Sequence, residues 1–363
     1  MNSSMQITQK QMHEFSKCEG VIFLGAVPIE KEPQYRYFKK WISDKKHAGM
    51  SFLERNSKLR EDPSLFNSEC NNALIFAFNY FQGDRYGGIK TVTKPKIAQY
   101  ARFRDYHKLL KIKAGNIVKK LCDTLSLDEL PHRILIDSAP VLERPLAQRT
   151  GAGFIGKNTV FISPKLGSYL LLFEIFVKAN IELSNLNPIE SSKRSENGGC
   201  GTCRRCQVNC PSGALTEDYV LDARKCIAYY TIEHRDIIPV EFWDYLKLYY
   251  FGCDICQLVC PYNRNIESSK EINAKVNDDL DLYSVALMDQ SDYESWFGGT
   301  PMTRAKINGL KRNALIYLIV TNDPRLNDVI AKLKGRERLV DQTIDQIDEY
   351  KRFKNSSSIE LNP

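Results

Sequence analysis

The feature that most constrains this chain is a dense group of cysteines in its second half. Eight of the eleven cysteines lie between positions 200 and 260. They form two runs that each end in Cys-Pro, with Cys226 between them: Cys200-x-x-Cys203-x-x-Cys206-x-x-x-Cys210-Pro211 and Cys253-x-x-Cys256-x-x-x-Cys260-Pro261. Two-residue spacers aim several sulfurs at one point, and a more distant cysteine closes the cage. The pattern predicts a ferredoxin-like domain with two [4Fe–4S] clusters.

The spacing also predicts which cysteines share a cluster. In two-cluster ferredoxins the last cysteine of each run ligates the other cluster. The first cluster is therefore expected on Cys200, Cys203, Cys206 and Cys260, and the second on Cys210, Cys226, Cys253 and Cys256. Cys226 replaces the missing first cysteine of the second run. The alternative is a pair of zinc sites, because Cys-x-x-Cys pairs also build zinc ribbons; the tripled spacing and the Cys-Pro ends disfavour it.

Composition sets the class of protein. The chain has 363 residues, of which 43% are hydrophobic and 26% charged, as is ordinary for a globular protein with two or three cored domains. The first residues do not resemble a secretory signal, and the longest apolar stretch, 169–177, is too short to span a bilayer. Grouped cysteines point to a reducing cytosol, so we expect a cytoplasmic protein without a membrane partner. Cys18, Cys70 and Cys122 are expected to be ordinary buried thiols.

The order of predicted elements suggests three domains and an α+β chain. Strands are expected at 20–25, 73–80, 132–137, 159–162 and 169–177. Helices are expected at 41–47, from just after Lys108 to about 125 and at 141–150, with a turn at Gly87 and Gly88. This alternation predicts an N-terminal α/β domain over 1–183. A polar linker at 184–199 opens the cluster domain, 184–265, and 266–363 is expected to be a small helical, HEAT-like region with helices at 303–322, 325–334 and 339–353.

A glycine-rich segment, Gly151-Ala-Gly-Phe-Ile-Gly-Lys157-Asn158, imitates two nucleotide-binding motifs. It follows a helical pattern and precedes a strand, which is the reverse of the order that a dinucleotide fingerprint requires. Asn158 also occupies the place of the hydroxyl residue of a phosphate-binding loop. We reject both motifs, although three glycines allow the backbone to approach a large ligand closely.

Several other motifs resemble those of the epoxyqueuosine reductase family. They are Tyr100-Ala-Arg-Phe-Arg-Asp-Tyr-His-Lys108, Asp137-Ser-Ala-Pro-Val-Leu-Glu-Arg144, Gly156-Lys-Asn-Thr159, Cys200-Gly-Thr-Cys-Arg-Arg-Cys206, Leu221-Asp-Ala-Arg-Lys-Cys226, Gly252-Cys-Asp-Ile-Cys-Gln257 and Gly299-Thr-Pro301. The resemblance covers roughly 45–315. It implies a cobalamin-dependent iron–sulfur enzyme that reduces epoxyqueuosine to queuosine at the wobble base of tRNA, the last step of queuosine synthesis, with a cobalamin-binding domain similar to that of reductive dehalogenases.

The chemistry that the resemblance implies needs a second cofactor beside the clusters. Conversion of an epoxide to an alkene takes up two electrons and two protons and releases water, whereas iron–sulfur clusters pass single electrons. The resemblance implies base-off cobalamin without a protein imidazole on cobalt. Asp105-Tyr-His107-Lys-Leu-Leu110 approaches the Asp-x-His-x-x-Gly pattern of cobalt-ligating histidines but has Leu110 in place of the glycine. His107 is therefore expected to line the pocket or to be structural.

The resemblance also assigns roles to single residues. The family's proton donor falls on Asp137, an acid at a predicted strand end, where desolvation beside an apolar cofactor would raise its pKa. The alternative role of Asp137 is the N-cap of the helix near Val141. Arg60 and Tyr100 match positions that contact cobalamin, and Lys157 and Asn158 are expected on the same surface. At two positions that bear on the pocket, Phe103 and Ala228, the chain departs from the family's usual glycine and serine.

The expected macromolecular partner is a tRNA anticodon arm, and the chain is expected to act as a monomer with an external electron donor that the sequence does not identify. A net charge of +7 agrees with a polyanionic partner. Basic residues gather in two stretches, around Lys108–Lys120 and around Arg304–Arg312, although a solvated helix face would look the same. Two alternatives stay open: a cobalamin-dependent reductase or dehalogenase of a small molecule, and a simple electron-transfer protein. The second leaves the motifs before the cysteines without a role.

Overall fold

The computed structural model describes residues 7–83, 95–179, 181–182, 199–269, 271–272, 274–276 and 279–356. Before the cysteine region its helices are α1 (Gln9–Cys18), α2 (Tyr35–Ser43), α3 (Ser57–Glu61), α4 (Tyr106–Leu125) and α5 (Glu143–Arg149), with short 3₁₀ turns η1 (Ser51–Leu53), η2 (Pro63–Phe66) and η4 (Gln99–Ala101). The strands of this part are β1 (Ile7–Thr8), β2 (Ile22–Pro28), β3 (Asn72–Asn79), β4 (Lys96–Ile97), β5 (His132–Ile136), β6 (Phe154–Ile155), β7 (Phe161–Ile162), β8 (Leu170–Val177) and β9 (Ile181–Glu182).

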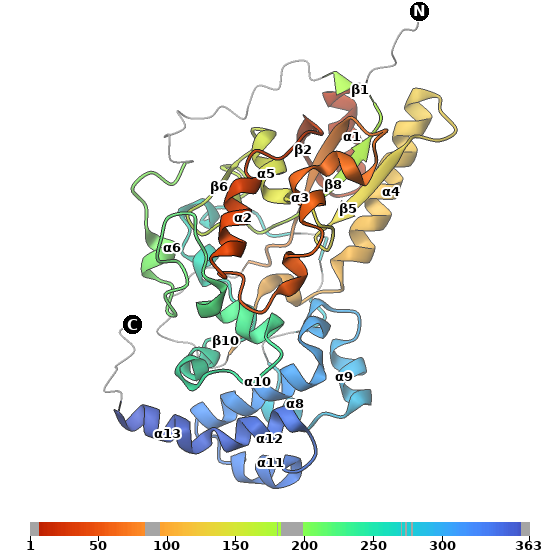
Figure 1. Cartoon of the computed structure of the whole chain (residues 1–363). Coiled ribbons are helices and arrows are strands. Elements are labelled where there is room, and N and C mark those ends of the chain that lie inside the picture. Colours follow the sequence, from red (N-terminus) through yellow and green to blue (C-terminus); the bar gives the residue numbers. More distant parts are fainter. Residues whose placement is uncertain are drawn as a thin grey trace, which may run out of the picture.

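A four-stranded sheet with the order β2-β3-β8-β5 forms the centre of the N-terminal part (Figure 1). All three pairings are antiparallel. This arrangement corrects the prediction of an α/β N-terminal domain, since that class requires parallel strands. The alternation of helices and strands along the chain misled the prediction, because β8 inserts between β3 and β5 instead of extending the sheet by crossovers. The overall α+β class is confirmed.

Both faces of this sheet are buried, which explains the nearly continuous apolar runs of β3 and β8. On one face, Leu74, Phe76 and Phe173 pack with side chains of α1 and α4. On the other face, alternate residues pack beneath α5, whose Leu146 and Ala147 are buried. The sheet is thus a rigid layer, and its β5 strand ends between α4 and α5.

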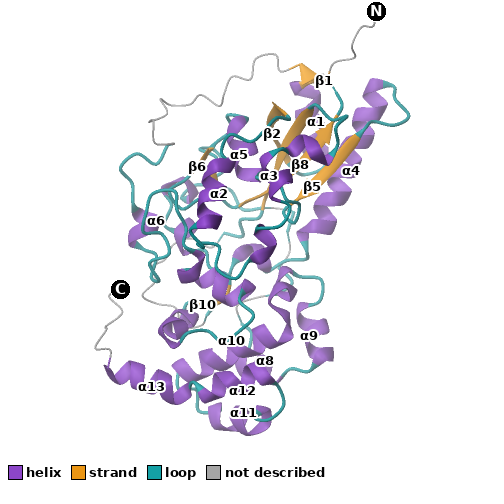
Figure 2. Cartoon of the chain, viewed as in Figure 1, coloured by secondary structure: helices purple, strands orange, loops and turns teal. Residues whose placement is uncertain are grey.

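The cysteine region contains little regular structure. It comprises α6 (Arg205–Val208), α7 (Ile255–Leu258), β10 (Tyr249–Phe251), the π-helical turn η6 (Tyr229–Glu233) and the 3₁₀ segments η5 (Ala223–Lys225), η7 (Val240–Lys247) and η8 (Pro261–Asn263). The short strands β10 and β4 pair in parallel and join this region to the N-terminal part. Figure 2 shows how much of the cysteine region is loop, as is usual where metal clusters organise the chain.

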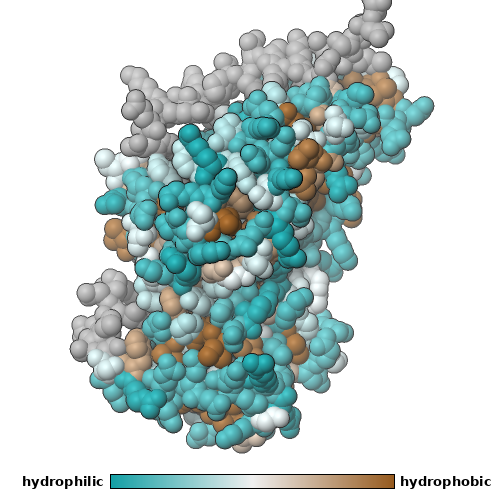
Figure 3. Space-filling model, in the orientation of Figure 1, coloured by the Kyte–Doolittle hydropathy of each residue, from teal (hydrophilic) through white to brown (hydrophobic). Residues whose placement is uncertain are grey.

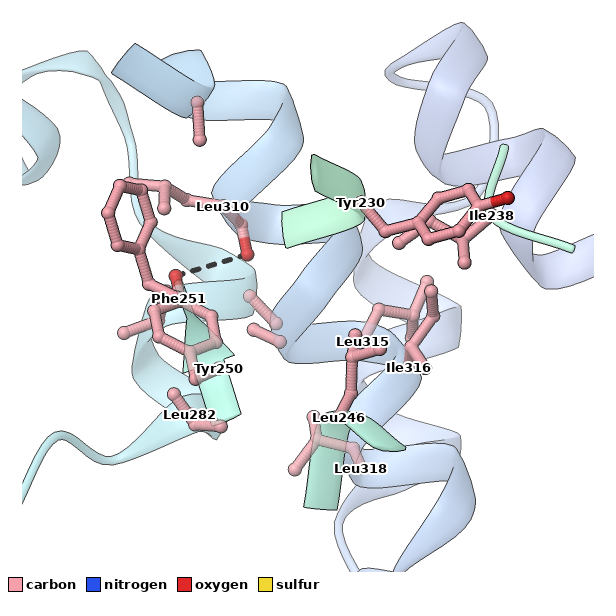
Figure 4. Packing of buried hydrophobic residues seen from close by; sticks show 14 of the residues in the cluster. Tyr230, Ile238, Leu246, Tyr250, Phe251, Leu282, Leu310, Leu315, Ile316 and Leu318 are labelled. Atoms are coloured by element: carbon pink, nitrogen blue, oxygen red, sulfur yellow. Dashed lines mark hydrogen bonds between the residues drawn. The ribbon is translucent and has the colours of Figure 1, made fainter. Parts of the chain in front are cut away.

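The C-terminal part is entirely helical in the residues that the structure describes, with α8 (Leu282–Leu287), α9 (Gln290–Phe297), η9 (Pro301–Ala305), α10 (Lys306–Val320), α11 (Leu326–Leu333), α12 (Arg338–Asp345) and α13 (Ile347–Ser356). Its central helix, α10, is buried on most sides. Figure 4 shows its Leu310 carbonyl accepting a 3.2 Å hydrogen bond from the Tyr250 hydroxyl. One apolar core therefore joins these helices to Tyr230 and Trp243 of the cysteine region, across the domain boundary predicted at 265/266.

Most predicted elements are confirmed, with shifted ends. The helix expected at 41–47 instead occupies Tyr35–Ser43, because Lys45 and Ala48 adopt left-handed conformations that end it. The turn at Gly87 and Gly88 and nearly all of the linker 184–199 lie outside the described residues. Phe103, which departs from the family pattern, is a buried core residue against Tyr80.

The visible surface is mostly hydrophilic, with apolar residues in small separate spots (Figure 3). Among the described residues, helices that combine the length and the apolar character needed to cross a membrane are absent.

Candidate active site and cluster region

Asp137 follows directly after β5 and has a positive φ of 42°. Its Oδ2 accepts a 2.6 Å hydrogen bond from the hydroxyl of Tyr106 and lies 3.4 Å from Nε2 of His107. The carboxylate is more than half exposed (57%), whereas Tyr106 is buried. A non-glycine residue in the left-handed region at the end of a rigid strand is a locally costly conformation of the kind found at functional sites.

The start of α4 presents the two partners of Asp137. Asp105 is the N-cap of α4 and accepts hydrogen bonds from the backbone N–H of His107 (2.9 Å) and from its Nδ1 (2.7 Å). The rings of Tyr106 and His107 stack at 4.4 Å. Helix capping thereby fixes the imidazole between two carboxylates, with one ring nitrogen toward each.

Charge in this cluster is distributed differently from the sequence-based expectation. Partial desolvation by the surrounding protein works to raise the pKa of Asp137, but the hydrogen bonds from His107 and Tyr106 prevail and lower it. The hydrogen bond to Asp137 outweighs desolvation in raising the pKa of His107 to about 9. The expected raised pKa of Asp137 is therefore wrong for this arrangement: at neutral pH the shared proton resides on the imidazole, because the ionised pair is mutually stabilising.

The alternative role of Asp137 as a helix cap is also wrong. Helix α5 begins at Glu143, and its N-cap, Leu142, makes no side-chain capping hydrogen bond. The contact runs the other way: the backbone N–H of Asp137 donates to Oε1 of Glu143 at 2.6 Å. Burial, followed by the negative charge of Asp137, raises the pKa of Glu143 to about 8. Glu143 is thus harder to ionise than an ordinary glutamate.

Tyr100 and Arg60, the expected cofactor contacts, lie on different elements. Tyr100 is half-buried in η4, and burial and the charges of Asp137 and Asp254 raise its pKa. A Cβ built on Gly252 would come within 2.5 Å of Ala98 and 3.7 Å of the Tyr100 ring, so the loop before Cys253 packs closely against this turn. Arg60 is buried in α3, donates to the carbonyl of Arg55 and lies over the ring of Phe38.

Lys157 and Asn158 face the cysteine region. The Lys157 ammonium forms a 3.0 Å ion pair with Asp218, and its backbone N–H points to Sγ of Cys200 at 3.5 Å. The Asn158 amide donates to the carbonyl of Cys256 at 3.4 Å. Both residues therefore join the glycine-rich segment to the cluster loops, and their predicted role at cobalamin stays a prediction.

The cysteines of the two runs interact with one another electrostatically. Burial and the negative charges of Cys200, Cys206 and Cys203 raise the pKa of Cys260 to about 11. Burial and the charges of Cys226, Cys210 and Cys206 raise the pKa of Cys256. Cys206 thus acts on cysteines of both predicted sets, and the division into two sets of four stays a prediction. Cys18 is exposed, contrary to its expected burial, while Cys70 is buried and Cys122 half-buried.

Among the described residues, no three Cys, His, Asp or Glu side chains converge on a point where one metal ion would be held.

Tyr106, Asp105 and Glu143 lie within the family motifs, but the sequence alone predicts no role for them. A motif shows which positions recur but not which side chains meet in space. The usable signal was the Asp-Tyr-His run at the predicted start of a helix, because an acid there caps the helix and directs the next two side chains.

Two family models match the chain. The model described as "Epoxyqueuosine reductase QueG, DUF1730" matches residues 60–138, and the "4Fe-4S double cluster binding domain" matches residues 199–263. The epoxyqueuosine reductase of Pseudomonas aeruginosa is 30% identical over 318 residues, which cover 86% of this chain and 85% of that protein. The one of Francisella cf. novicida is 32% identical over 313 residues, which cover 82% of each.

Solved structures of epoxyqueuosine reductases share the fold of this chain. The epoxyqueuosine reductase of Streptococcus thermophilus superposes with a TM-score of 0.79 at 23% identity, covering 98% of this chain and 95% of the other. A complex of such an enzyme with a tRNA-Tyr epoxyqueuosine-modified stem loop gives a TM-score of 0.76 at 21% identity, covering 97% and 95%. A Bacillus subtilis structure with its catalytic aspartate loop swung out of the active site gives 0.76 at 20% identity, with the same coverage.

Proposed function

The chain belongs to the epoxyqueuosine reductase family, and we propose that it reduces the epoxide of epoxyqueuosine in tRNA with Asp137 as the residue that protonates the departing oxygen. The reaction takes up two electrons and two protons and releases water. The observation that carries the assignment of Asp137 is its position: a strained residue at the exposed end of a buried sheet, bound to Tyr106 and His107.

The residues around Asp137 have separate roles in holding and transferring a proton. At rest, Nε2 of His107 carries the proton and Oδ2 of Asp137 the negative charge. Tyr106 fixes the carboxylate by donating to the same oxygen. As negative charge develops on the epoxide oxygen, the proton passes from His107 through Asp137 to that oxygen. Asp105 holds the imidazole in place throughout, which avoids reorganisation during the step.

The cysteine domain is a double 4Fe-4S domain, and we propose cobalamin as the second cofactor. When bound, the clusters would supply single electrons and cobalamin the two-electron chemistry at carbon. The donor set fits a base-off cofactor without a protein imidazole on cobalt, because the two ring nitrogens of His107 already face Asp105 and Asp137. Tyr100 and Arg60 would hold the cofactor, with Lys157 and Asn158 nearer the clusters.

A tRNA stem loop is the proposed substrate, and a groove of about 440 Å³ offers it a basic surface. The groove runs between the end of η6, the start of α10 and α12, and its lining includes Arg235, Lys306 and Arg338. Arg304, which precedes the lining residue Ala305, pairs with Glu233 and is within electrostatic range of Asp137. Lysine and arginine on such a surface would neutralise backbone phosphates.

Several basic residues near this groove have structural roles instead. Arg312 is fully buried and donates to the carbonyls of Tyr230, His234 and Asp236. Lys311, which is buried, forms a 2.6 Å ion pair with the half-buried Glu337. The basic stretch that the sequence suggested is therefore only partly available to an RNA.

The decisive experiment is anaerobic reconstitution with iron, sulfide and cobalamin, followed by incubation with tRNA that contains epoxyqueuosine. Nucleoside analysis should detect queuosine, with conversion requiring both reductant and cobalamin. Conversion without cobalamin would remove the second cofactor from the proposal. Reduction of small halogenated compounds but not of the modified tRNA would favour a small-molecule reductase.

A further inference from the structure

Glu174 is a carboxyl group in the middle of the central sheet. It lies in β8, between Ile75 of β3 and Leu135 of β5, and none of its surface is exposed. Neither carboxyl oxygen has a hydrogen-bond partner among the described residues. A bare carboxylate in such a place is prohibitively costly, so the group is held as the neutral acid. Burial raises its pKa well above the ordinary value.

The sheet directs this acid toward the candidate site. Leu172 and Phe176 lie two residues before and after Glu174 in β8, and both pack in the core beneath α5. Residues two apart on a strand share a face, so Glu174 points to the same side. Its cross-strand partner Leu135 is two residues before Asp137. Asp137 in turn binds through its N–H to Glu143, the first residue of α5. Glu174 is also within electrostatic range of Glu143 and Asp137, because their negative charges help to raise its pKa.

The proposed reaction needs a source for its second proton, which Glu143 and Glu174 would supply. Each epoxide consumes two protons, whereas Asp137 is ionised at rest and His107 holds one proton. A large RNA and a cofactor over the site would separate it from water, so a second proton needs a source within the protein. The pKa values of Glu143 and Glu174 are both raised, that of Glu143 to about 8, which favours the protonated acids at neutral pH.

We propose that Glu143 and Glu174 form a proton store behind Asp137, a proposal that rests on the function assigned above. After Asp137 has protonated the departing oxygen, the Glu143 carboxyl gives its proton to the Asp137 carboxylate. Glu174 then gives its own proton to Glu143 through a bridging water molecule, since its carboxyl has no direct partner among the described residues. Glu174 regains a proton from water, through the same carboxyls, when the product leaves. Glu174 does not touch the substrate and acts through Glu143.

Charged and polar groups from neighbouring elements face the three carboxyl groups. Asp137 is faced by His107, Tyr106 and Arg144, and Glu143 by Asp137, Arg144 and His107. Around Glu174, the core residues of β3 and β5 on the same face are apolar, and the charged groups of the described residues that act on it are Glu143 and Asp137. Structural stability does not explain the acid, because an apolar residue would fill this position at lower cost.

The test compares Glu174→Gln with the reconstituted wild-type enzyme. Glutamine matches the neutral acid in shape but has no proton to release. We expect normal melting behaviour and cofactor loading, but conversion about tenfold slower that accelerates with added small weak acids such as formate or imidazole. The wild-type rate should not depend on these buffers. Glu143→Gln should behave in the same way and tests the proposal if Glu174→Gln folds poorly.

A control and a second measurement complete the test. Glu32→Gln makes the same change at a buried glutamate whose neighbours are Glu30 and Arg149, and it should give no buffer dependence. The infrared spectrum of the wild type at neutral pH should contain a protonated-carboxyl band that Glu174→Gln lacks. Absence of that band from the wild type would overturn the proposal. So would rates in Glu174→Gln and Glu143→Gln that equal the wild-type rate and do not depend on the buffer. Failure of the wild type to convert the RNA would instead reject the assigned function and leave the infrared result standing.

Discussion

The hydroxyl of Tyr106 and the carboxylate of Asp137 are joined by a 2.6 Å hydrogen bond between the start of α4 and the end of β5. Tyr106 is buried, whereas the Asp137 side chain is largely exposed. The bond therefore holds an exposed acid on a rigid support. Because a hydrogen bond to the ionised form favours that form, the same contact helps to keep Asp137 charged at rest.

Replacement of Asp137 by asparagine tests the proton transfer itself. Asparagine retains the size and still accepts from Tyr106, but it cannot carry a carboxylic proton. Single-turnover conversion of epoxyqueuosine tRNA should fall by roughly 10²- to 10⁴-fold. Cobalamin affinity and tRNA affinity should persist. Near-normal conversion would end the assignment, and lost cobalamin binding would make Asp137 a cofactor contact first.

Replacement of Tyr106 by phenylalanine should raise the pKa of Asp137, because the carboxylate loses a donor that stabilises its charge. In a pH–rate profile the acidic limb should move upward by roughly one pH unit. The matched control is Tyr350→Phe, which removes a similar 3.0 Å hydrogen bond to Asp244 in another part of the protein. An unchanged acidic limb in Tyr106→Phe would show that this bond does not set the charge of Asp137.

The raised pKa of His107 predicts a pH-dependent contribution to stability. An unfolded histidine titrates near 6.5, and His107 in the folded protein near 9. The stabilising contribution is complete below about pH 6.5 and is lost as the pH rises through about 9. His107→Gln should therefore lower the melting temperature at pH 6 but not at pH 10. The effect should be small, because the imidazole and its partners are partly exposed. An equal loss at both values would indicate packing alone.

The sequence predicted the double 4Fe-4S domain and the long buried strands, because each follows from local chemistry. Cysteine spacing dictates which sulfurs can share a cluster, and an apolar run such as 73–80 must be buried whatever surrounds it. The antiparallel pairing was missed because it depends on where β8 inserts, which no local pattern encodes. Likewise, the charge of Asp137 depends on Tyr106 and His107, which are 31 and 30 positions away in the chain.

The two predicted cluster sets differ in which distant cysteine completes them, and this is measurable. The wild type should hold about eight irons per chain. Cys260→Ala should lose mainly the cluster on Cys200, Cys203 and Cys206, and Cys226→Ala mainly the other, each leaving about four irons. Iron analysis and electron paramagnetic resonance would check this. Cys70→Ala removes a buried thiol outside the clusters and should retain full iron. Full iron in the other two variants would reject the ligand sets.

The groove between η6, α10 and α12 predicts which basic residues contact the RNA. Lys306 and Arg338 are exposed and line it, so each should neutralise about one phosphate. Lys306→Ala and Arg338→Ala should weaken binding of the stem loop and reduce the slope of log affinity against log salt by about one unit each.

Conversion at saturating RNA should remain near the wild-type rate in both variants, because neither residue belongs to the Asp137 cluster. Lys334→Ala is the control, since it removes an exposed lysine of the same helical part that does not line the groove. Titrations over a range of salt concentrations distinguish specific phosphate contacts in the groove from a general effect of net charge. If all three variants lose affinity equally, the RNA senses only the net charge of the protein. If Lys306→Ala and Arg338→Ala bind as the wild type does, the stem loop lies elsewhere. A loss confined to these two, with a shallower salt slope, places the phosphates of the RNA in the groove.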